Sequence, residues 1–414
     1  MEKFFPIKTA TACQLKWNWS TLYLYTGFTA SCHRTGGGKI TPETFDTFHN
    51  TEKKQQERQR MLQGLWPEQS CGYCRKIEES GGSSDRILHL TMPNQSPIEL
   101  ESDPRAVVVQ PTILEVFFNN QCNLSCVYCS PEYSSKINQE YKKFGTFEKN
   151  GIVLKSIDID VNYQEMLKQF WTWMNKHSSR LVRFHIAGGE GFYQPEFETC
   201  LDYFESTNHP NLEFVVITNL MIVPEKLERI VQRFKNLVKV RKLKRVELLC
   251  SIDCVGAEQE YARYGISVDK WILNFERLLQ ERWLTLNIQS TITLLTLKTM
   301  PELIEKLKVW RLKHKVGHYF SALVEPTYLI PNIFGNQVFD KDFYNILLAM
   351  PENTKDDLNA KTYMQGIASN YRQSQPNPVE MLKLKTFLDE NDRRRGSDWN
   401  TTFPWLAKEL AHVV

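Results

Sequence analysis

Short apolar segments alternate with amphipathic helical segments between residues 112 and 325, and this alternation constrains the fold more than any other feature of the sequence. Strand–helix repeats of this size favour parallel strands joined by right-handed crossovers. Six such repeats are too few to close an eight-stranded barrel, so we expect an α/β fold with a partial (β/α)6 TIM-like barrel that is open on one side. The segments expected to be strands are 113–118, 181–187, 212–218, 246–252, 287–294 and 319–324.

A cysteine motif directly follows the first expected strand. Cys122, Cys126 and Cys129 are spaced C-x3-C-x2-C. Three thiolates at this spacing can bind three irons of a [4Fe–4S] cube and leave the fourth iron open to a small molecule. The alternatives are a structural metal knuckle or buried free thiols. Zinc knuckles usually use paired C-x2-C units and a fourth ligand nearby, which this stretch lacks.

Polar residues stand where later strands are expected to end, the edge at which barrels of this kind carry their chemistry. Gly188 and Gly189 would let a ligand approach the backbone, and free amides with the Glu190 carboxylate suit an ammonium group. Arg263 offers a guanidinium fork for a carboxylate, or it is a charge on a helix surface. The other candidates at strand ends are Asn219, Ser251, Asp253 and Ser290.

Together these motifs resemble the signature of the radical S-adenosylmethionine (SAM) superfamily, in which an aromatic residue, here Tyr128, precedes the last cysteine. The resemblance covers residues 110–325. It implies that Cys122, Cys126 and Cys129 hold a [4Fe–4S] cluster that binds SAM and splits it to a 5′-deoxyadenosyl radical, which takes a hydrogen atom from the substrate.

The resemblance also implies roles for residues at the strand ends. Gly188, Gly189 and Glu190 match a motif that holds the SAM amino group, although Gly191 stands where a proline is usual. Cys254 likewise replaces the glycine that usually follows S-I-D. Ser251 and Asp253 are implied to support the SAM ribose, and Arg263 to meet the SAM carboxylate. The other positions implied to bind SAM are Tyr128, Asn219 and Ser290.

A second cysteine group, Cys13, Cys32, Cys71 and Cys74, precedes the expected barrel. Four thiolates from scattered positions can close a tetrahedral Zn²⁺ site or fully ligate a second Fe–S cluster. We expect an auxiliary [4Fe–4S] cluster, with zinc as the alternative. The group resembles that of the twitch/SPASM-like branch, where the extra cysteines usually follow the barrel. The aromatic stretch 17–28 predicts a strand or hairpin between Cys13 and Cys32.

Three domains are expected: an auxiliary-cluster domain over 1–107, the barrel over 108–330 and a helical extension over 331–414. Segment 131–160 is too long for an ordinary strand–helix loop, and we expect it to frame the substrate entrance. Thr299 and Glu302 predict a capping box at the start of a helix. The arginine run 393–395 predicts a solvated face.

The composition gives no sign of a nucleic-acid or membrane partner. The net charge of +3 with 24% charged residues does not require a nucleic-acid or membrane partner. No apolar run reaches the ~18 residues of a spanning helix, and the N-terminus lacks the apolar core of a signal peptide, so we expect a cytoplasmic protein.

The resemblance finally implies a substrate class. Relatives with an extra cluster often modify ribosomally made precursor peptides by cross-linking, epimerisation or backbone excision. A separate leader-peptide-binding protein and a flavodoxin or ferredoxin electron donor are then the expected partners. The alternatives are a radical SAM enzyme acting on tRNA or a small metabolite, and a non-catalytic, metal-stabilised binding protein.

Overall fold

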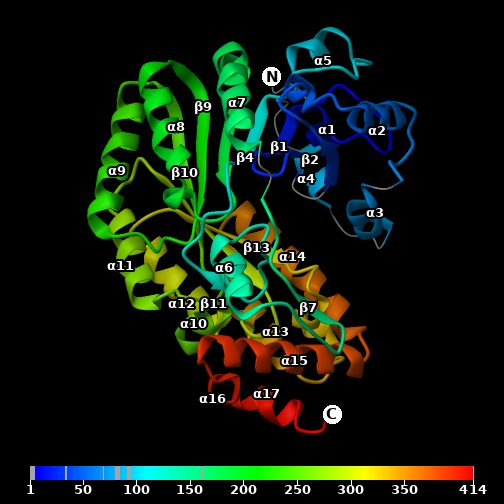
Figure 1. Cartoon of the computed structure of the whole chain (residues 1–414), viewed down its shortest axis with the longest axis vertical. Helices are drawn as coiled ribbons and strands as arrows, with labels where there is room; N and C mark the ends of the chain where they lie inside the picture. The colour runs from blue at the N-terminus through cyan, green and yellow to red at the C-terminus, as the bar shows by residue number, and fades with distance from the viewer. Residues whose placement is uncertain are drawn as a thin grey trace. The chain divides into compact units, whose positions relative to one another are not determined.

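A computed structural model describes residues 5–32, 35–68, 70–79, 84–90, 95–159 and 162–413. The chain is a mixed α/β protein with a large, mostly parallel sheet. It divides into two compact units: Met1–Asn119, Asp158–Val216 and Asn236–Val246 form the first, and Asn120–Ile157, Ile217–Lys235 and Glu247–Val414 form the second. The domain boundaries expected at 107/108 and 330/331, and the partial-barrel description, stay predictions. Figure 1 labels the helices and strands.

The sheet of the first unit joins the N-terminal segment to the first strands of the expected barrel. Its order is β9 (His209–Thr218), β8 (Arg183–Ala187), β4 (Ile113–Phe117), β1 (Trp19–Tyr23), β2 (Phe28–Cys32) and β3 (Thr35–Lys39). β9, β8, β4 and β1 are parallel, and β1, β2 and β3 form an antiparallel meander. The β1–β2 hairpin covers most of the stretch expected to be a strand or hairpin, and β1 pairs with β4 along its whole length.

Helices of the first unit place the second cysteine group and cover the sheet. The helices α1 and α2 lie beside the hairpin (Figure 1). Met166, Phe170, Trp173 and Met174 of α7 are buried, as their helical spacing predicts. The helices are α1 (Gln14–Asn18), α2 (Glu52–Leu62), α3 (Gly72–Glu79), α4 (Asp85–Leu90), α5 (Ile98–Ser102), α7 (Tyr163–His177) and α8 (Pro195–Ser206).

The second unit contains the later parallel strands and the helical C-terminal part. β10 (Leu243–Ser251), β12 (Thr285–Ile292) and β13 (Val316–Ala322) pair in parallel, with the first residues of β10 belonging to the first unit. Two short pairs, β5 (Ser125–Cys126) with β11 (Arg263–Tyr264) and β6 (Phe147–Lys149) with β7 (Ile152–Leu154), are antiparallel. The helices are α6 (Ser135–Phe144), α10 (Gly256–Ala262), α11 (Val268–Leu278), α12 (Met300–Arg311), α13 (Asp340–Ala349), α14 (Lys355–Arg372), α15 (Pro378–Arg395), α16 (Trp399–Thr402) and α17 (Pro404–Glu409), while α9 (Pro224–Lys239) runs from this unit into the first.

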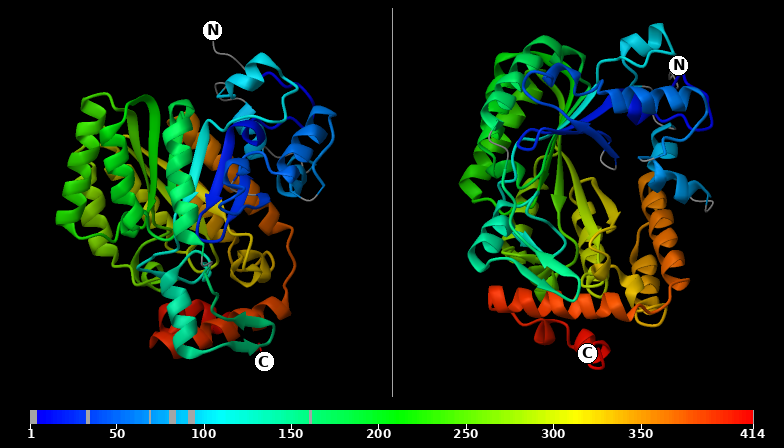
Figure 2. Two further views of the ribbon diagram at one scale, coloured as in Figure 1. Left: turned by 45° about the horizontal axis from the view of Figure 1, so that its top comes forward. Right: turned by 45° about the vertical axis from the view of Figure 1, so that its right-hand side comes forward.

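Residues 131–157 of the long segment are a folded element of the second unit. They form α6 and the β6–β7 hairpin, and Figure 2 shows this hairpin against α15. Ile137, Ile152 and Leu154 are buried in one core cluster with residues of the C-terminal helices. The segment's expected place at a substrate entrance stays a prediction.

Two local predictions were wrong. α12 begins at Met300 as expected, but the Thr299 side chain makes no cap hydrogen bond, so the capping box does not form. The arginine run is not simply a solvated face. Arg394 is buried against Glu390, and the side chain of Arg395 is 4% exposed in an ion pair with Glu140 of α6, because both side chains at the end of α15 turn toward α6.

Candidate functional site

The loop 120–130 carries the three-cysteine motif and is fixed by its own hydrogen bonds. Ser134 Oγ donates to the Leu124 carbonyl at 2.8 Å, and Ser135 N donates to the Asn120 carbonyl at 2.7 Å. Cys129 N donates to the Cys126 carbonyl at 3.1 Å, which folds the C-x2-C half into a turn. These bonds bring Cys122, Cys126 and Cys129 together on one short loop, where all three residues are half-buried.

A two-stranded pair connects this loop to the segment after β10. Cys126 in β5 lies opposite Arg263 in β11, and Val127 N donates to the Ala262 carbonyl at 2.9 Å. The sequence interval between Cys126 and Arg263 is long, so this pairing could not be read from the local pattern. It places a guanidinium beside the central cysteine.

The Asp253 carboxylate is the hub of this arrangement. Arg263 donates from Nε to Oδ2 and from Nη2 to Oδ1, both at 2.8 Å. Tyr128 OH donates to Oδ2 at 2.6 Å, and Thr291 N donates to Oδ1 at 2.7 Å. Asp253 is fully buried, and these four donors use all the lone-pair sites that a carboxylate offers. Asp253 therefore clamps the cysteine loop to the ends of β10 and β12.

These bonds affect the ligand-binding roles that the sequence suggests for Asp253 and Arg263. Asp253 and Arg263 bind one another, so a ribose hydroxyl at Asp253 or a ligand carboxylate at Arg263 would have to displace one of these bonds. Burial lowers the pKa of Arg263, but Asp253 and Tyr128 outweigh it and hold the pKa well above its usual value. Burial also raises the pKa of the Tyr128 hydroxyl well above its usual value. Arg263 stays charged and Tyr128 stays protonated, as the clamp requires.

The thiols fit a cationic metal centre by their chemistry. Burial raises the pKa of Cys129, and the neighbouring Cys126 and Cys122 raise it further. Burial likewise raises the pKa of Cys126, against the lowering effect of Arg263. Three adjacent thiolates are stable together only with a bound cation, and soft sulfur donors select iron–sulfur clusters or zinc. The Leu124 amide, 3.5 Å from Cys122 Sγ, adds a donor to sulfur.

Two further candidates of this unit are engaged within the protein. Asn219 Nδ2 donates to Asn123 Oδ1 at 2.8 Å, which ties the end of β9 to the cysteine loop. Ser290 is buried, donates to the Ile252 carbonyl at 2.6 Å and lies 2.9 Å from His318 Nε2. Ser251 is buried at the end of β10. Sequence reasoning missed Asn123, whose type alone gave no signal.

Gln259 was also missed. Its Oε1 accepts hydrogen bonds from Asp253 N at 3.1 Å and from Cys254 N at 2.9 Å. This acceptor fixes the turn after β10 at the position where Cys254 replaces the usual glycine. A polar residue on a short helix was the only signal, and it did not single out Gln259.

The Gly188–Glu190 turn belongs to the first unit and ends β8. Gly188 and Gly189 have φ of +80° and +50°. A Cβ on Gly188 would collide with the Phe117 ring, so both backbone and space require glycine there. Glu190 is buried, and its carboxylate accepts from Phe192 N at 3.2 Å. The carboxylate therefore caps the short 3-10 turn that begins at Gly191.

The second cysteine group converges in the first unit. Cys13, Cys32, Cys71 and Cys74 line one cavity. Cys13 precedes α1, Cys32 ends β2, and Cys71 and Cys74 lie at the start of α3. Burial raises the pKa of Cys13, and Cys32 and Cys71 raise it further, so the four sulfurs also need a cation to ionise together. Their role as metal ligands stays a prediction.

Across the ranges that the structure describes, no group of at least three His, Cys, Asp or Glu side chains has the geometry to hold a metal ion. Within the same ranges, no helix is long and apolar enough to cross a membrane.

Comparisons with known proteins return distant structural likenesses alone. No family model and no curated protein matches the sequence. The matching solved structures include "Crystal structure of Streptococcus suis SuiB bound to precursor peptide SuiA", with 11% identity, a TM-score of 0.38 and coverage of 93% of this chain and 73% of that chain. They also include "Crystal structure of Streptococcus suis SuiB bound to S-adenosylmethionine" (13%, 0.35, 86% and 68%) and "Structure of TYW1 with a lysine-pyruvate adduct bound" (12%, 0.29, 56% and 70%). At these TM-scores, none of the likenesses supports a conclusion about this chain.

Proposed function

We propose that this protein is a radical SAM enzyme. A [4Fe–4S] cluster on Cys122, Cys126 and Cys129 would supply reductive cleavage of SAM to a 5′-deoxyadenosyl radical. The observation that carries the proposal is the clamped three-cysteine loop: three thiols on one loop after a parallel strand, held by Asp253 to the carboxyl ends of β10 and β12.

The chain's own residues have distinct tasks in this proposal. Cys122, Cys126 and Cys129 would bind the cluster, and Tyr128 and Arg263 would hold their loop in place through Asp253. At the end of β8, the Glu190 carboxylate would be suited to an ammonium group.

Cofactor chemistry is tested with anaerobically purified and reconstituted protein. Iron and sulfide are counted, and 5′-deoxyadenosine is measured after SAM and dithionite are added. We expect cleavage in the wild-type protein and none in Cys126→Ala. Cys200→Ala, which removes a buried thiol outside the loop, is the matched control and should cleave SAM. A wild-type protein that takes up no iron and leaves SAM whole contradicts the proposal.

We further propose a ribosomally made precursor peptide as the substrate, modified by cross-linking, epimerisation or backbone excision. The presence of a second cysteine group and the mild net charge support a peptide over an RNA. A separate leader-binding protein and a flavodoxin or ferredoxin would be the partners. Co-expression with candidate precursor peptides and mass spectrometry tests this proposal. Activity on a metabolite or on tRNA, with no peptide mass change, would overturn it and leave the radical SAM proposal standing.

The second cysteine group is proposed to hold an auxiliary [4Fe–4S] cluster. The convergence of Cys13, Cys32, Cys71 and Cys74 on one cavity supports a four-sulfur metal site. Iron counted in Cys122→Ala/Cys126→Ala/Cys129→Ala protein tests it. If this variant binds zinc and no iron, the second cysteine group is a structural zinc site and not an auxiliary cluster.

A further inference from the structure

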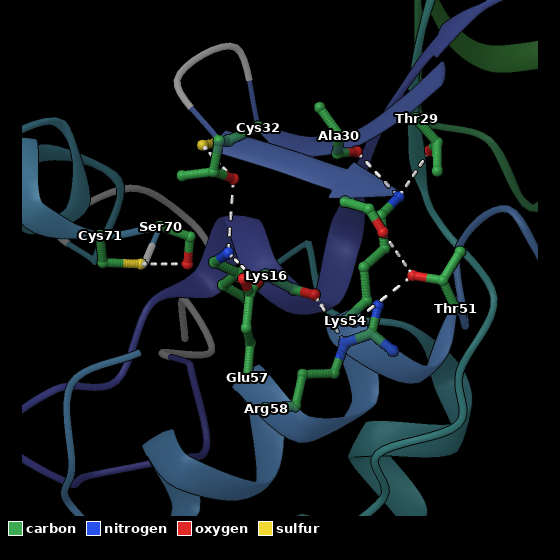
Figure 3. Close-up of polar contacts among 12 residues, drawn as sticks. Lys16, Thr29, Ala30, Cys32, Thr51, Lys54, Glu57, Arg58, Ser70 and Cys71 are labelled. Carbon is green, nitrogen blue, oxygen red and sulfur yellow. Dashed lines mark hydrogen bonds and ion pairs between the residues drawn. The ribbon is translucent and has the colours of Figure 1, made fainter. Parts of the chain in front are cut away.

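A buried lysine lies on the wall of the four-cysteine cavity. Lys16 Nζ donates to Thr35 Oγ1 at 3.4 Å, and that hydroxyl lies 3.5 Å from Cys32 Sγ. Lys16 also forms an ion pair with Glu57, and Figure 3 shows this pair together with Cys32 and Cys71. Lys16 is 2% exposed, so its charge acts on the cavity with little screening by water.

Two more basic side chains are buried behind Lys16, and burial together with Arg58 and Lys16 lowers the pKa of Lys54 well below its usual value unless an anion is nearby. Lys54 Nζ has four neutral acceptors within 3.0 Å: Ser20 Oγ, Thr29 Oγ1 and the carbonyls of Ala30 and Phe48. The five hydrogen bonds from Arg58 likewise end on neutral groups, among them the Lys16 carbonyl at 2.7 Å. Within the described residues, neither side chain forms an ion pair with a carboxylate.

The charges around the cavity therefore do not balance. Lys16, Lys54 and Arg58 are buried, and Glu57 is the one buried carboxylate that pairs with any of them in the described part of the chain. Of the other charged groups on the cavity wall, Arg86 is paired with Glu78, and Asp85 is only half-buried.

An excess of buried positive charge is costly unless an anion is nearby, since a buried ion without a partner loses its hydration and gains nothing in return. Four protonated thiols are neutral and offset none of this positive charge. A dication or dicationic cluster bound by four thiolates has a net charge of two minus, which is opposite in sign to the excess around Lys16.

We propose that Lys16, with Arg58 and Lys54 buried behind it, stabilises an anionic metal–thiolate centre in the four-cysteine cavity. The inference rests on the proposed second metal site and adds the residues that set its charge. Lys16 is the positioning cation nearest to the sulfurs, and Glu57 partly neutralises it.

The test uses the full chain with Cys122→Ala/Cys126→Ala/Cys129→Ala, so that metal bound at the first motif is not counted. This parent is reconstituted with iron and sulfide or, separately, with zinc, and is dialysed against EDTA. Lys16→Met in the parent should lower the metal retained at a fixed EDTA concentration about threefold or more, because it removes one nearby positive charge. Lys39→Met is the matched control on the exposed end of β3 and should retain as much metal as the parent.

Glu57→Gln removes a negative charge near the cavity, where Lys16→Met removes a positive one, and it keeps an acceptor for Lys16. It should raise metal retention and, with iron bound, shift the cluster toward its reduced state at a fixed potential, whereas Lys16→Met should shift it toward the oxidised state. Equal retention in Lys16→Met and the parent overturns the inference. If Lys16→Met does not fold, retention in Glu57→Gln at or below that of the parent overturns it as well. A parent that binds neither iron nor zinc defeats the second metal site itself, which separates the two failures.

Discussion

Among single residues, Asp253 decides how the cysteine loop is held. Its four hydrogen bonds come from a loop tyrosine, a strand amide and a bidentate arginine. A buried ion pair is strongly destabilising when one partner is removed, because the other charge remains without compensation. The cost of losing Asp253 therefore includes the isolated Arg263 guanidinium.

Asp253→Asn should destabilise the protein by about 3 kcal/mol or more, since an amide satisfies Arg263 poorly. Tyr128→Phe removes one hydrogen bond to a charged group and should cost about 2 kcal/mol. Chemical denaturation followed by circular dichroism measures both, and Asp356→Asn on the exposed start of α14 is the control. An Asp253→Asn variant as stable as this control would show that the clamp does not hold the loop.

Gly188 is the residue for which the backbone leaves least choice. Gly188→Ala should destabilise the protein by about 1–3 kcal/mol, because φ is +80° and the added methyl meets the Phe117 ring. Gly366→Ala, inside α14 with open space around it, should instead stabilise by about 0.5–1 kcal/mol. Thermal unfolding of the two variants should give shifts of opposite sign, and two shifts of the same sign would contradict this reading of the turn.

At the level of elements, the β6–β7 hairpin is attached to the C-terminal helices by alternate residues of β7. Ile152 and Leu154 are buried, and Val153 between them is exposed. Arg395 of α15 adds an ion pair to Glu140 of α6. The segment that the sequence marked as a long insertion is therefore part of the core of the second unit, and its removal would expose that core.

Ile152→Ala should cost about 2–5 kcal/mol as a large-to-small change in a core. Val153→Ala, the adjacent position on the other face of the same strand, should change stability by less than about 0.5 kcal/mol. The free energies of unfolding from urea titrations compare them directly. Similar losses at both positions would mean that the hairpin is not held by one face.

The six parallel strands were predictable because each is a buried apolar run. β4, β8, β9, β10, β12 and β13 overlap the six expected segments, with ends that differ by a few residues. Three contacts were not predictable: the pairing of β1 with β4, the pairing of β5 with β11, and the hydrogen bond from Tyr128 to Asp253. Each joins residues far apart in the sequence, and local periodicity contains no information about which distant segments pair. The four N-terminal cysteines were found by type, but Lys16 gave no local signal.

For the whole molecule, buried histidines make stability depend on pH. Burial, with a smaller contribution from Arg311, lowers the pKa of His318 to about 3 in the second unit. Burial, with Arg58 and Lys54, also lowers the pKa of His49 well below its usual value in the first unit. A histidine whose folded pKa is depressed binds more protons when unfolded. Its contribution to stability is complete above pH ~6.5 and is lost as the pH falls toward the folded pKa.

The metal-free protein should therefore lose stability progressively from pH ~6.5 downward, with a limiting slope on the order of 1.4 kcal/mol per pH unit for each such histidine. His318→Gln removes one titrating group and should flatten this dependence between pH 6.5 and 4. Thermal unfolding across that range, in wild type and variant, checks the prediction. An unchanged slope would show that His318 is not kept neutral by the fold.

The parallel pairing of β1 with β4 has a consequence for synthesis. During translation the meander of β1, β2 and β3 leaves the ribosome well before the strand that completes its open side. Until then, one row of amides and carbonyls of β1 lacks its native partner, and exposed strand edges of this kind template aggregation. The yield of native protein should accordingly fall when a translational pause is introduced between Tyr23 and Ile113.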